Sequence, residues 1–401
     1  TLNSDLLAKQ AGTNFTNSLL VGTSSTGTLN DANSNTGVGI GVFGALTTGD
    51  NNVAVGLNAL DVNTTGCFNT ALGASTLLVN QTGICNVAIG ASALRCNTAS
   101  NNIAVGVQPL YYNTSGTQNT AIGTKALFCN TTADNNTALG YNSLLNNTTG
   151  AANTALGIHA MEKNISGGIN VATGAYSLAC NTTGADNTAN GGYAMKENTT
   201  GTGNVGVGRS ALRCNTTAAS NTAVGCGALC LNTTGASNVA VGKQALDANT
   251  TGGNNIAIGD NALTSNTTNT TNIAIGASAL YANNAAGDNL AIGQQAAAAN
   301  LSGYHLTSIG HYSLLANTSA QGNTAVGHSS LRTTTTGAAN TAVGKQTLCK
   351  TTTGGNNVAL GYAALCLNTT GADNVALGYD ALVSNTTGTS NVAIGVTALD
   401  G

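Results

Sequence analysis

Residues 221–225 read NTAVG, and seventeen residues later residues 238–242 read NVAVG. Between the two phrases come two variable residues, Ala-Leu, two more variable residues, Asn-Thr-Thr-Gly and a further pair. The glycine that closes the phrase returns from Gly39 to Gly395 in steps of 17 residues, with a single step of 16 between Gly90 and Gly106. A period this constant predicts that every repeat makes the same structural turn. We therefore expect a stack of similar coils.

Positions are numbered here from that closing glycine, so that Val224 stands at −1 and Leu229 at +4. Position +4 is Leu in nearly every repeat, −1 is mostly Val, Ile or Leu, −3 is mostly Thr, Val or Ile, and −2 is mostly Ala. This alternation is typical of a strand with one buried face. We predict that −3 and −1 point inward and Ala outward. Thr173 and Asn190 replace the aliphatic residue at −1, so we predict that they bond to each other or to water inside the core.

The 401 residues would ordinarily suggest two or three globular domains, but the repeat outweighs that expectation. Charged residues make up 6% of the chain and aromatic residues 3%, with 53 Gly, a composition that without a period would indicate low complexity. A disordered chain has no reason to keep the period. Residues 1–34 fit the frame poorly and are predicted to be an N-terminal cap or inter-subunit attachment segment. Residues 35–401 are predicted to be one repeat array.

Helical solenoids use longer repeats than this one, and Asn-Thr-Thr-Gly in each repeat would end a helix. The predicted fold class is therefore all-β, a parallel β-solenoid (β-roll) of about 22 coils whose strands lie about 4.8 Å apart.

Asn recurs at −4, where it opens the strand phrase. In a parallel stack identical amides lie above one another and bond along the axis, so we predict an Asn ladder at corners of αL geometry. Its members include Asn52, Asn69, Asn86, Asn102, Asn119, Asn136, Asn153, Asn221, Asn238, Asn255 and Asn391.

The phrases NTAVG at 323–327 and NTTG at 368–371 resemble the repeats of phage tail-fibre and related surface-fibre proteins. The phrase VAIG at 87–90 and 392–395 is similar to the head repeats of trimeric autotransporter adhesins. The resemblance covers residues 35–401. It implies a left-handed parallel β-roll assembled as a trimer outside a cell.

Ten cysteines occur. Six of them fall in adjacent coils at nearly equal heights, where stacking brings Cα atoms to about 5 Å, inside the range for a disulfide. The candidate disulfides are Cys67 with Cys85, Cys214 with Cys230, and Cys349 with Cys366. The alternative is that Cys simply fills a half-exposed position. A zinc site is disfavoured because paired Cys-x-x-Cys motifs are lacking.

Asn-Thr-Thr at +7 to +9 is also an N-glycosylation acceptor, for example at Asn63, Asn181, Asn232 and Asn385. An Asn turned inward as a second ladder is not open to modification, and we favour that ladder. Rows of Thr also suggest ice binding. Such a surface needs Thr two residues apart on one strand face, however, whereas these two Thr are adjacent.

Several function classes are disfavoured. The net charge of −3 and the scattered Lys and Arg provide no basic stripe for nucleic acid. No apolar run approaches the roughly 18 residues of a membrane span. No catalytic constellation recurs, and His311 with His328, equivalent in neighbouring coils, lack a carboxylate ligand in the frame. We predict no enzyme, cofactor or metal.

The predicted function is that of a structural protein, the rigid shaft of an extracellular filament or fibre assembled by subunit association, end to end or as a trimer. One alternative is a receptor-binding or adhesive fibre that binds surface glycans or a cell-surface receptor, as a virion tail fibre or a trimeric adhesin head does. An ice-binding solenoid is the other. Clustered aromatic residues on one face, such as Tyr111, Tyr141 and Tyr362, would favour the adhesive fibre.

Overall fold

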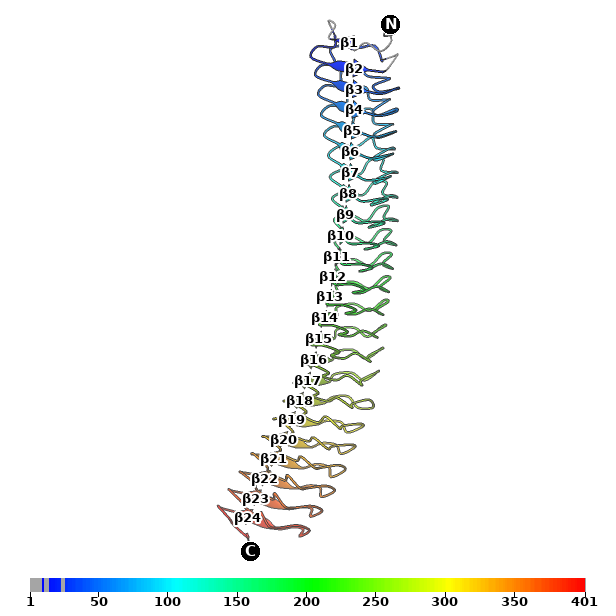
Figure 1. Ribbon diagram of the computed structural model, residues 1–401. Coiled ribbons are helices and arrows are strands. Elements are labelled where there is room, and N and C mark those ends of the chain that lie inside the picture. Colours follow the sequence, from blue (N-terminus) through cyan, green and yellow to red (C-terminus); the bar gives the residue numbers. More distant parts are fainter. Residues whose placement is uncertain (1–8, 11–13, 23–25, 401) are drawn as a thin grey trace. The chain divides into compact units, whose positions relative to one another are not determined.

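The computed structural model describes residues 9–10, 14–22 and 26–400 of the chain. It divides into two compact units, Thr1–Thr202 and Gly203–Gly401. No α-helix occurs among the described residues. From β2 on, each unit is built from three-residue strands, one to a coil (Figure 1).

The strands of the first unit are β1 (Lys9–Gln10), β2 (Leu19–Val21), β3 (Thr36–Val38), β4 (Val53–Val55), β5 (Thr70–Leu72), β6 (Val87–Ile89), β7 (Ile103–Val105), β8 (Thr120–Ile122), β9 (Thr137–Leu139), β10 (Thr154–Leu156), β11 (Val171–Thr173) and β12 (Thr188–Asn190). Those of the second unit are β13 (Val205–Val207), β14 (Thr222–Val224), β15 (Val239–Val241), β16 (Ile256–Ile258), β17 (Ile273–Ile275), β18 (Leu290–Ile292), β19 (Thr307–Ile309), β20 (Thr324–Val326), β21 (Thr341–Val343), β22 (Val358–Leu360), β23 (Val375–Leu377) and β24 (Val392–Ile394).

From β2 on, neighbouring strands within each unit pair in parallel, and equivalent residues of neighbouring coils face each other. In the first unit Ala155 pairs with Ala172, and in the second Ala240 pairs with Ala257. The all-β parallel solenoid with a period near 17 residues is thereby confirmed. The left-handed winding expected from the resemblance stays a prediction.

The stacked array begins earlier than residue 35. Strand β2 pairs in parallel with β3 in the same register, Leu20 opposite Gly37, and Leu20 is buried. Strand β1 pairs with β2 in antiparallel fashion. The predicted cap or attachment segment 1–34 thus contains a strand in register with the array, and its residues 1–8, 11–13 and 23–25 lie outside the described part of the chain.

The strand faces are opposite to those predicted. Ala54 and Ala240 at −2 are fully buried, whereas Val53 and Val55 are each 38% exposed and Val241 is 36% exposed. The prediction that −3 and −1 point inward was wrong. The predicted internal bond between Thr173 and Asn190 was wrong for the same reason, because Asn190 is exposed on the outer face of β12.

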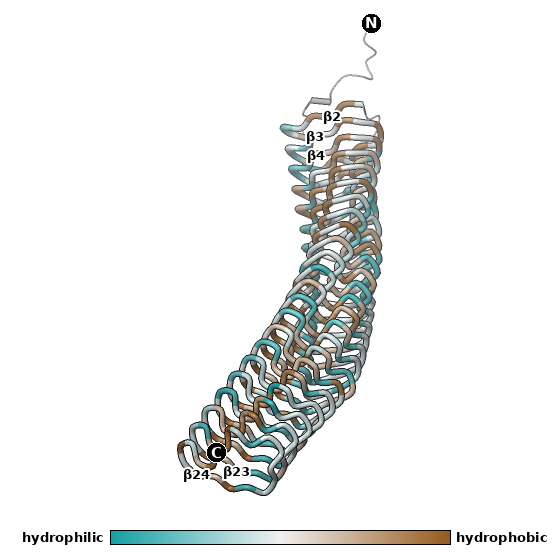
Figure 2. The backbone as a smooth tube through the Cα atoms, turned by 60° about the horizontal axis from the view of Figure 1, so that its bottom comes forward, coloured by the Kyte–Doolittle hydropathy of each residue, from teal (hydrophilic) through white to brown (hydrophobic). Residues whose placement is uncertain are grey.

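The coil is too thin for large side chains on both of its inner walls. Ser308 at −2 and Ser313 at +3 show the distance directly, because their hydroxyl oxygens lie 2.6 Å apart across the coil. In most coils both positions are Ala, and the Leu at +4, such as Leu229, is fully buried beside them. In most coils the core therefore holds one large apolar side chain, the Leu at +4. Hydrophobic segments recur along the stacked coils (Figure 2).

Residues with positive φ bend the chain at four positions of each coil: −5, the closing glycine, +2 and +4. Gly225 has φ of 134°, and a Cβ there would lie 2.4 Å from the carbonyl oxygen of Gly242, so only glycine fits. The buried Leu229 itself has φ of 50°, an unusual αL conformation for a bulky residue. The prediction that the Asn residues at −4 occupy αL corners was wrong. The residue before each of them makes that turn, as Ser237 does with φ of 60° before Asn238.

The single 16-residue step is absorbed in the turn between +7 and the next −4. Asn97 donates to the carbonyl of Ala99, two residues on, whereas in regular coils the bond spans three residues. The −4 ladder continues through this coil, since the backbone N–H of Asn102 donates to Asn86 Oδ1 at 3.0 Å. The Oδ1 atom of Asn80 finds no hydrogen-bond partner among the described residues. The turn therefore accommodates the missing residue, and the cost is the hydrogen bond that Asn80 Oδ1 would otherwise accept.

Candidate functional site

The side-chain ladder at −4, here called the first ladder, uses all the bonding capacity of its amides. In the second unit Asn238 Nδ2 donates to the carbonyl of Gly252 at 2.9 Å and to Asn221 Oδ1 at 3.2 Å. Asn238 Oδ1 accepts from the backbone N–H of Asn255 at 3.0 Å and from its Nδ2 at 3.2 Å. The predicted Asn ladder is confirmed.

The members named from the sequence all make bonds of this kind: Asn52, Asn69, Asn86, Asn102, Asn119, Asn136, Asn153, Asn221, Asn238, Asn255 and Asn391. Leu306 interrupts the side-chain series, but its backbone N–H still donates to Asn289 Oδ1 at 3.0 Å.

A second ladder is formed by the Asn residues at +7. In the first unit Asn181 Nδ2 donates to Asn164 Oδ1 at 2.8 Å and to the carbonyl of Gly184 at 2.9 Å. Of the four glycosylation candidates, Asn63, Asn181 and Asn232 are fully buried, and Asn385 is half-buried and bonded to Asn368. An amide that is buried and bonded in this way has no room for a glycan in the folded chain.

The two Thr residues that follow the second ladder have different surroundings. Thr233 Oγ1 donates to the carbonyl of Thr250 in the next coil at 2.9 Å, and Thr234 is exposed. The Thr hydroxyls therefore do not line one strand face at a spacing of two residues, which is the arrangement that ice binding was expected to need.

The second ladder is interrupted in the second unit. Positions +7 of two consecutive coils are Thr334 and Thr351, both fully buried. Their Oγ1 atoms and the Oδ1 atom of Asn317 find no hydrogen-bond partner among the described residues. Buried polar atoms without partners each cost about 1–3 kcal/mol, so these coils are a weak point of the array.

Completing the second ladder is expected to stabilise these coils. The double substitution Thr334→Asn with Thr351→Asn supplies donors and acceptors between Asn317 and Asn368, and we expect a gain of about 2–3 kcal/mol. Slower amide hydrogen exchange in residues 331–368 would report it. The exposed pair Thr336→Asn with Thr353→Asn is the control and should leave exchange unchanged; equal effects of the two pairs would contradict the ladder explanation.

The six candidate disulfide cysteines differ in where their sulfurs lie. All ten cysteines are thiols in this structure. Cys67 Sγ accepts from the Asp50 backbone N–H at 3.3 Å, and Cys85 is exposed. Burial, and then the charge of Asp247, raises the pKa of Cys230. Only Cys349 and Cys366 occupy the same frame position, +5, in adjacent coils. All three pairings stay predictions at this point.

Aromatic side chains stack along the coil axis. In the first unit the rings of His159 and Tyr176 lie 5.0 Å apart and those of Tyr176 and Tyr193 lie 5.4 Å apart, nearly parallel, with Tyr141 edge-on against His159. These four residues are called the aromatic column. In the second unit Tyr362 stacks on Tyr379 at 5.2 Å. Because stacked rings cover each other's faces, the column presents mainly ring edges and hydroxyls.

Charged groups are few, and one ion pair joins neighbouring residues of the first unit. Lys196 Nζ lies 2.9 Å from Glu197 Oε1 and holds the pKa of that carboxyl below its usual range. His311 and His328 both pack edge-on against Tyr312. Within the described residues, no three His, Cys, Asp or Glu side chains gather closely enough to hold a metal ion. Nor does the described part of the chain contain a helix long and apolar enough to cross a membrane.

The outward side chains at −3 and −1 form an apolar surface, called here the outer sheet face. On β15–β18 it consists of eight aliphatic side chains: Val239, Val241, Ile256, Ile258, Ile273, Ile275, Leu290 and Ile292. All eight are at least partly exposed. No charged residue occurs in strands β2–β24, although −3 is Thr in ten of them, so the face is uncharged along each unit and fully aliphatic on β15–β18.

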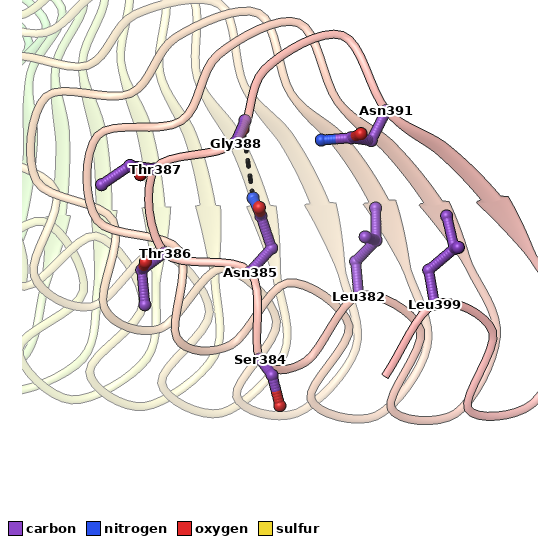
Figure 3. Close-up of a pocket in the computed structure, with 8 residues that line it drawn as sticks. All are labelled: Leu382, Ser384, Asn385, Thr386, Thr387, Gly388, Asn391 and Leu399. Atoms are coloured by element: carbon purple, nitrogen blue, oxygen red, sulfur yellow. Dashed lines mark hydrogen bonds between the residues drawn. The ribbon is translucent and has the colours of Figure 1, made fainter. Parts of the chain in front are cut away.

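A cavity of about 410 Å³ lies at the last described coil (Figure 3). Leu382, Asn385 and Leu399 are among its lining residues, and Asn385 donates to the carbonyl of Gly388. In the preceding coils the equivalent side chains are covered by the next coil. The cavity is thus the open face of this coil and contains no distinct cluster of reactive groups.

No family model matches the chain, and no curated protein matches it in sequence.

Proposed function

We propose that this chain is a non-catalytic structural protein, the rigid shaft of an extracellular filament or fibre assembled by association of its subunits. The observation that carries the proposal is the repetition of saturated hydrogen bonding: each coil gives its buried amides to its neighbours in constant register. Stability that accumulates coil by coil suits a long, stiff element. Half-exposed positions such as +1, +5 and +6 vary and present the surface to the environment.

Subunit association is assigned to the outer sheet face, with a second copy of this chain as the partner. The face recurs once per coil, so a second copy offers the same spacing along its whole length. It also carries no charge, so two such faces meet without repulsion. At about 50 Å² per side chain, β15–β18 alone offer roughly 400 Å². About eight coils in register would reach the roughly 800 Å² per partner of a stable interface.

The test is electron microscopy with sedimentation analysis of the purified chain. We expect assemblies that grow with protein concentration and that are lost in the double variant Val241→Lys with Ile258→Lys. The matched control is Leu231→Lys, which charges an aliphatic residue 42% exposed outside the sheet face. A wild-type chain that stays monomeric at all concentrations would refute the association. Indefinite polymers support the filament, and discrete rods of defined length support the adhesive fibre.

The adhesive fibre is kept as a second proposal because the aromatic column clusters Tyr141, Tyr176 and Tyr193 on one turn of adjacent coils. Glycan or cell binding that is lost in Tyr176→Ser would support it. Binding that is absent from the wild-type chain would leave the shaft as the better account.

A further inference from the structure

Two cysteines stack at position +5 in the coils of β21 and β22. We propose that Cys349 and Cys366 are a thiol–disulfide pair, oxidised by a low-molecular-weight disulfide, whose crosslink joins two adjacent coils where the second ladder is interrupted. The inference is independent of whether the chain forms a shaft.

The geometry brings the two sulfurs together. The backbone N–H of Lys350 donates to the carbonyl of Cys366 at 3.0 Å, which ties the two chain segments as neighbouring rungs. Rungs of such a stack lie about 4.8 Å apart, inside the Cα range of disulfides. The two side chains lie close enough that each is the first cause of the shift in the other's pKa. Cys349 is buried and Cys366 is half-buried.

The pair spans the step where the ladder fails. Thr351 and Asn368 stand two residues after Cys349 and Cys366, in the same two coils. Thr351 Oγ1 has no hydrogen-bond partner among the described residues, so the side-chain bond that joins other neighbouring coils at +7 is missing there. A covalent bond between the two cysteines would hold together the coils that lack this link.

The other two candidate pairs are also tied by backbone hydrogen bonds, from Cys85 N–H to the Cys67 carbonyl and from Cys214 N–H to the Cys230 carbonyl, both at 3.0 Å, but their frame positions differ by one residue. Cys67 stands at +11 and Cys85 at +12, and Cys214 at +6 and Cys230 at +5, so neither pair is directly stacked. Cys67 Sγ is bonded to the backbone of Asp50 and Thr65 rather than to Cys85. The geometry therefore selects one of the three predicted disulfides.

The two thiols have different acidities, which assigns their roles. The hydrogen bond from Cys366, with help from the nearby Lys350 and Arg332, lowers the pKa of Cys349 to about 6 against the effect of burial. The same bond, burial and the Cys349 charge raise the pKa of Cys366, which only Lys350 and a backbone hydrogen bond oppose. Cys349 is therefore the thiolate near neutral pH and the attacking nucleophile.

The reaction balances as two thiol–disulfide exchanges. The Cys349 thiolate attacks a sulfur of the disulfide RSSR, forms Cys349–S–S–R and releases RS⁻, which takes up a proton. In this mixed disulfide the Cys349 sulfur carries no charge. Neither its charge nor its hydrogen bond with Cys366 then raises the pKa of Cys366. Cys366 then loses its proton and attacks the Cys349 sulfur, and the second RS⁻ leaves. Two electrons pass from the two cysteines to RSSR, giving 2 RSH and the crosslink.

Oxidised glutathione and the full chain test the proposal. Peptide mass mapping is expected to show the Cys349–Cys366 bond before any bond between Cys214 and Cys230. Cys366→Ser should instead accumulate the glutathione adduct on Cys349. Prior or equal formation of the Cys214–Cys230 bond, or adducts without any crosslink in the wild-type chain, would overturn the assignment.

Two further readouts separate the nucleophile from the role of the crosslink. The iodoacetamide reaction of Cys349 should level off above about pH 7, whereas that of Cys129, whose pKa burial raises, should still increase above pH 9. Oxidation should slow hydrogen exchange in residues 345–368 at least tenfold, and by less in the Thr334→Asn, Thr351→Asn background where the ladder is complete. Equal pH profiles would refute the thiolate role, and unchanged exchange would refute the coil-joining role.

Discussion

Replacing Ala240 with Leu is expected to destabilise its coil by about 3 kcal/mol, at the upper end of the usual cost of overpacking. Ala240 is fully buried at −2 and faces the equally buried Ala245 at +3 across a thin coil. At the same two positions of another coil, the hydroxyl oxygens of Ser308 and Ser313 lie 2.6 Å apart, so there is little space between the −2 and +3 side chains. Three added carbon atoms have no space without displacing the opposite wall.

The matched control lies one residue along the same strand. Val241→Leu adds volume outward, and Leu occurs naturally at this position as Leu139 and Leu360. We expect a change within about 0.5 kcal/mol. Amide hydrogen exchange in residues 238–262 is the suitable measurement, because repeat arrays open coil by coil rather than in one step. A larger effect at Val241 than at Ala240 would contradict the assignment of the inner and outer faces.

Replacing Asn238 with Leu is expected to cost about 4 kcal/mol, since several buried groups lose their partners at 1–3 kcal/mol each. The substitution leaves the carbonyl of Gly252, the backbone N–H of Asn255 and the side chain of Asn221 without the bonds that they have now. Leu306 shows that the volume of Leu fits this column, so the loss is attributable to hydrogen bonding.

The effect should be local and specific to the ladder. Faster hydrogen exchange is expected in the coils of β14–β16. Thr234→Ala, at an exposed side chain, should leave the rates unchanged. If Asn238→Leu were as mild as Thr234→Ala, the ladder would be incidental to rigidity, and the shaft proposal would lose its main support.

The period of the sequence determined much of the fold in advance. A glycine every 17 residues predicts coils of equal length, and equal coils in a parallel stack place equivalent Asn residues above one another. The stacked register and both Asn ladders follow from that spacing alone. The winding direction does not, because the same spacing fits either hand.

The orientation of the strand was predicted wrongly because alternation shows that two sets of side chains face opposite ways but not which set is inside. Size and chemistry were the better indicators. Position −2 is small in every described coil from β3 on, Gly37, Gly206 and Ser308 included, whereas −1 accepts Thr173 and Asn190. A position that is always small marks the closely packed wall, and one that accepts Asn faces water.

The thiol pairing was only partly predictable. The sequence placed six cysteines in adjacent coils, but a difference of one frame position separates Cys214 from Cys230 and directs Cys67 toward Asp50. Side-chain direction at a corner depends on the local φ values, such as 57° at Cys85, which composition and spacing do not reveal. The outer sheet face was missed because it required the correct strand orientation.

The short coil between Gly90 and Gly106 has a consequence for how such a chain can change in length. Losing one residue there removed a partner from Asn80 but left the first ladder continuous. Gain or loss of a whole repeat disturbs even less, since each newly adjacent coil meets the same surface as the one it replaces. Duplication or deletion of a sequence repeat can thus lengthen or shorten the stack by one coil at a time. The packing of the interior need not change.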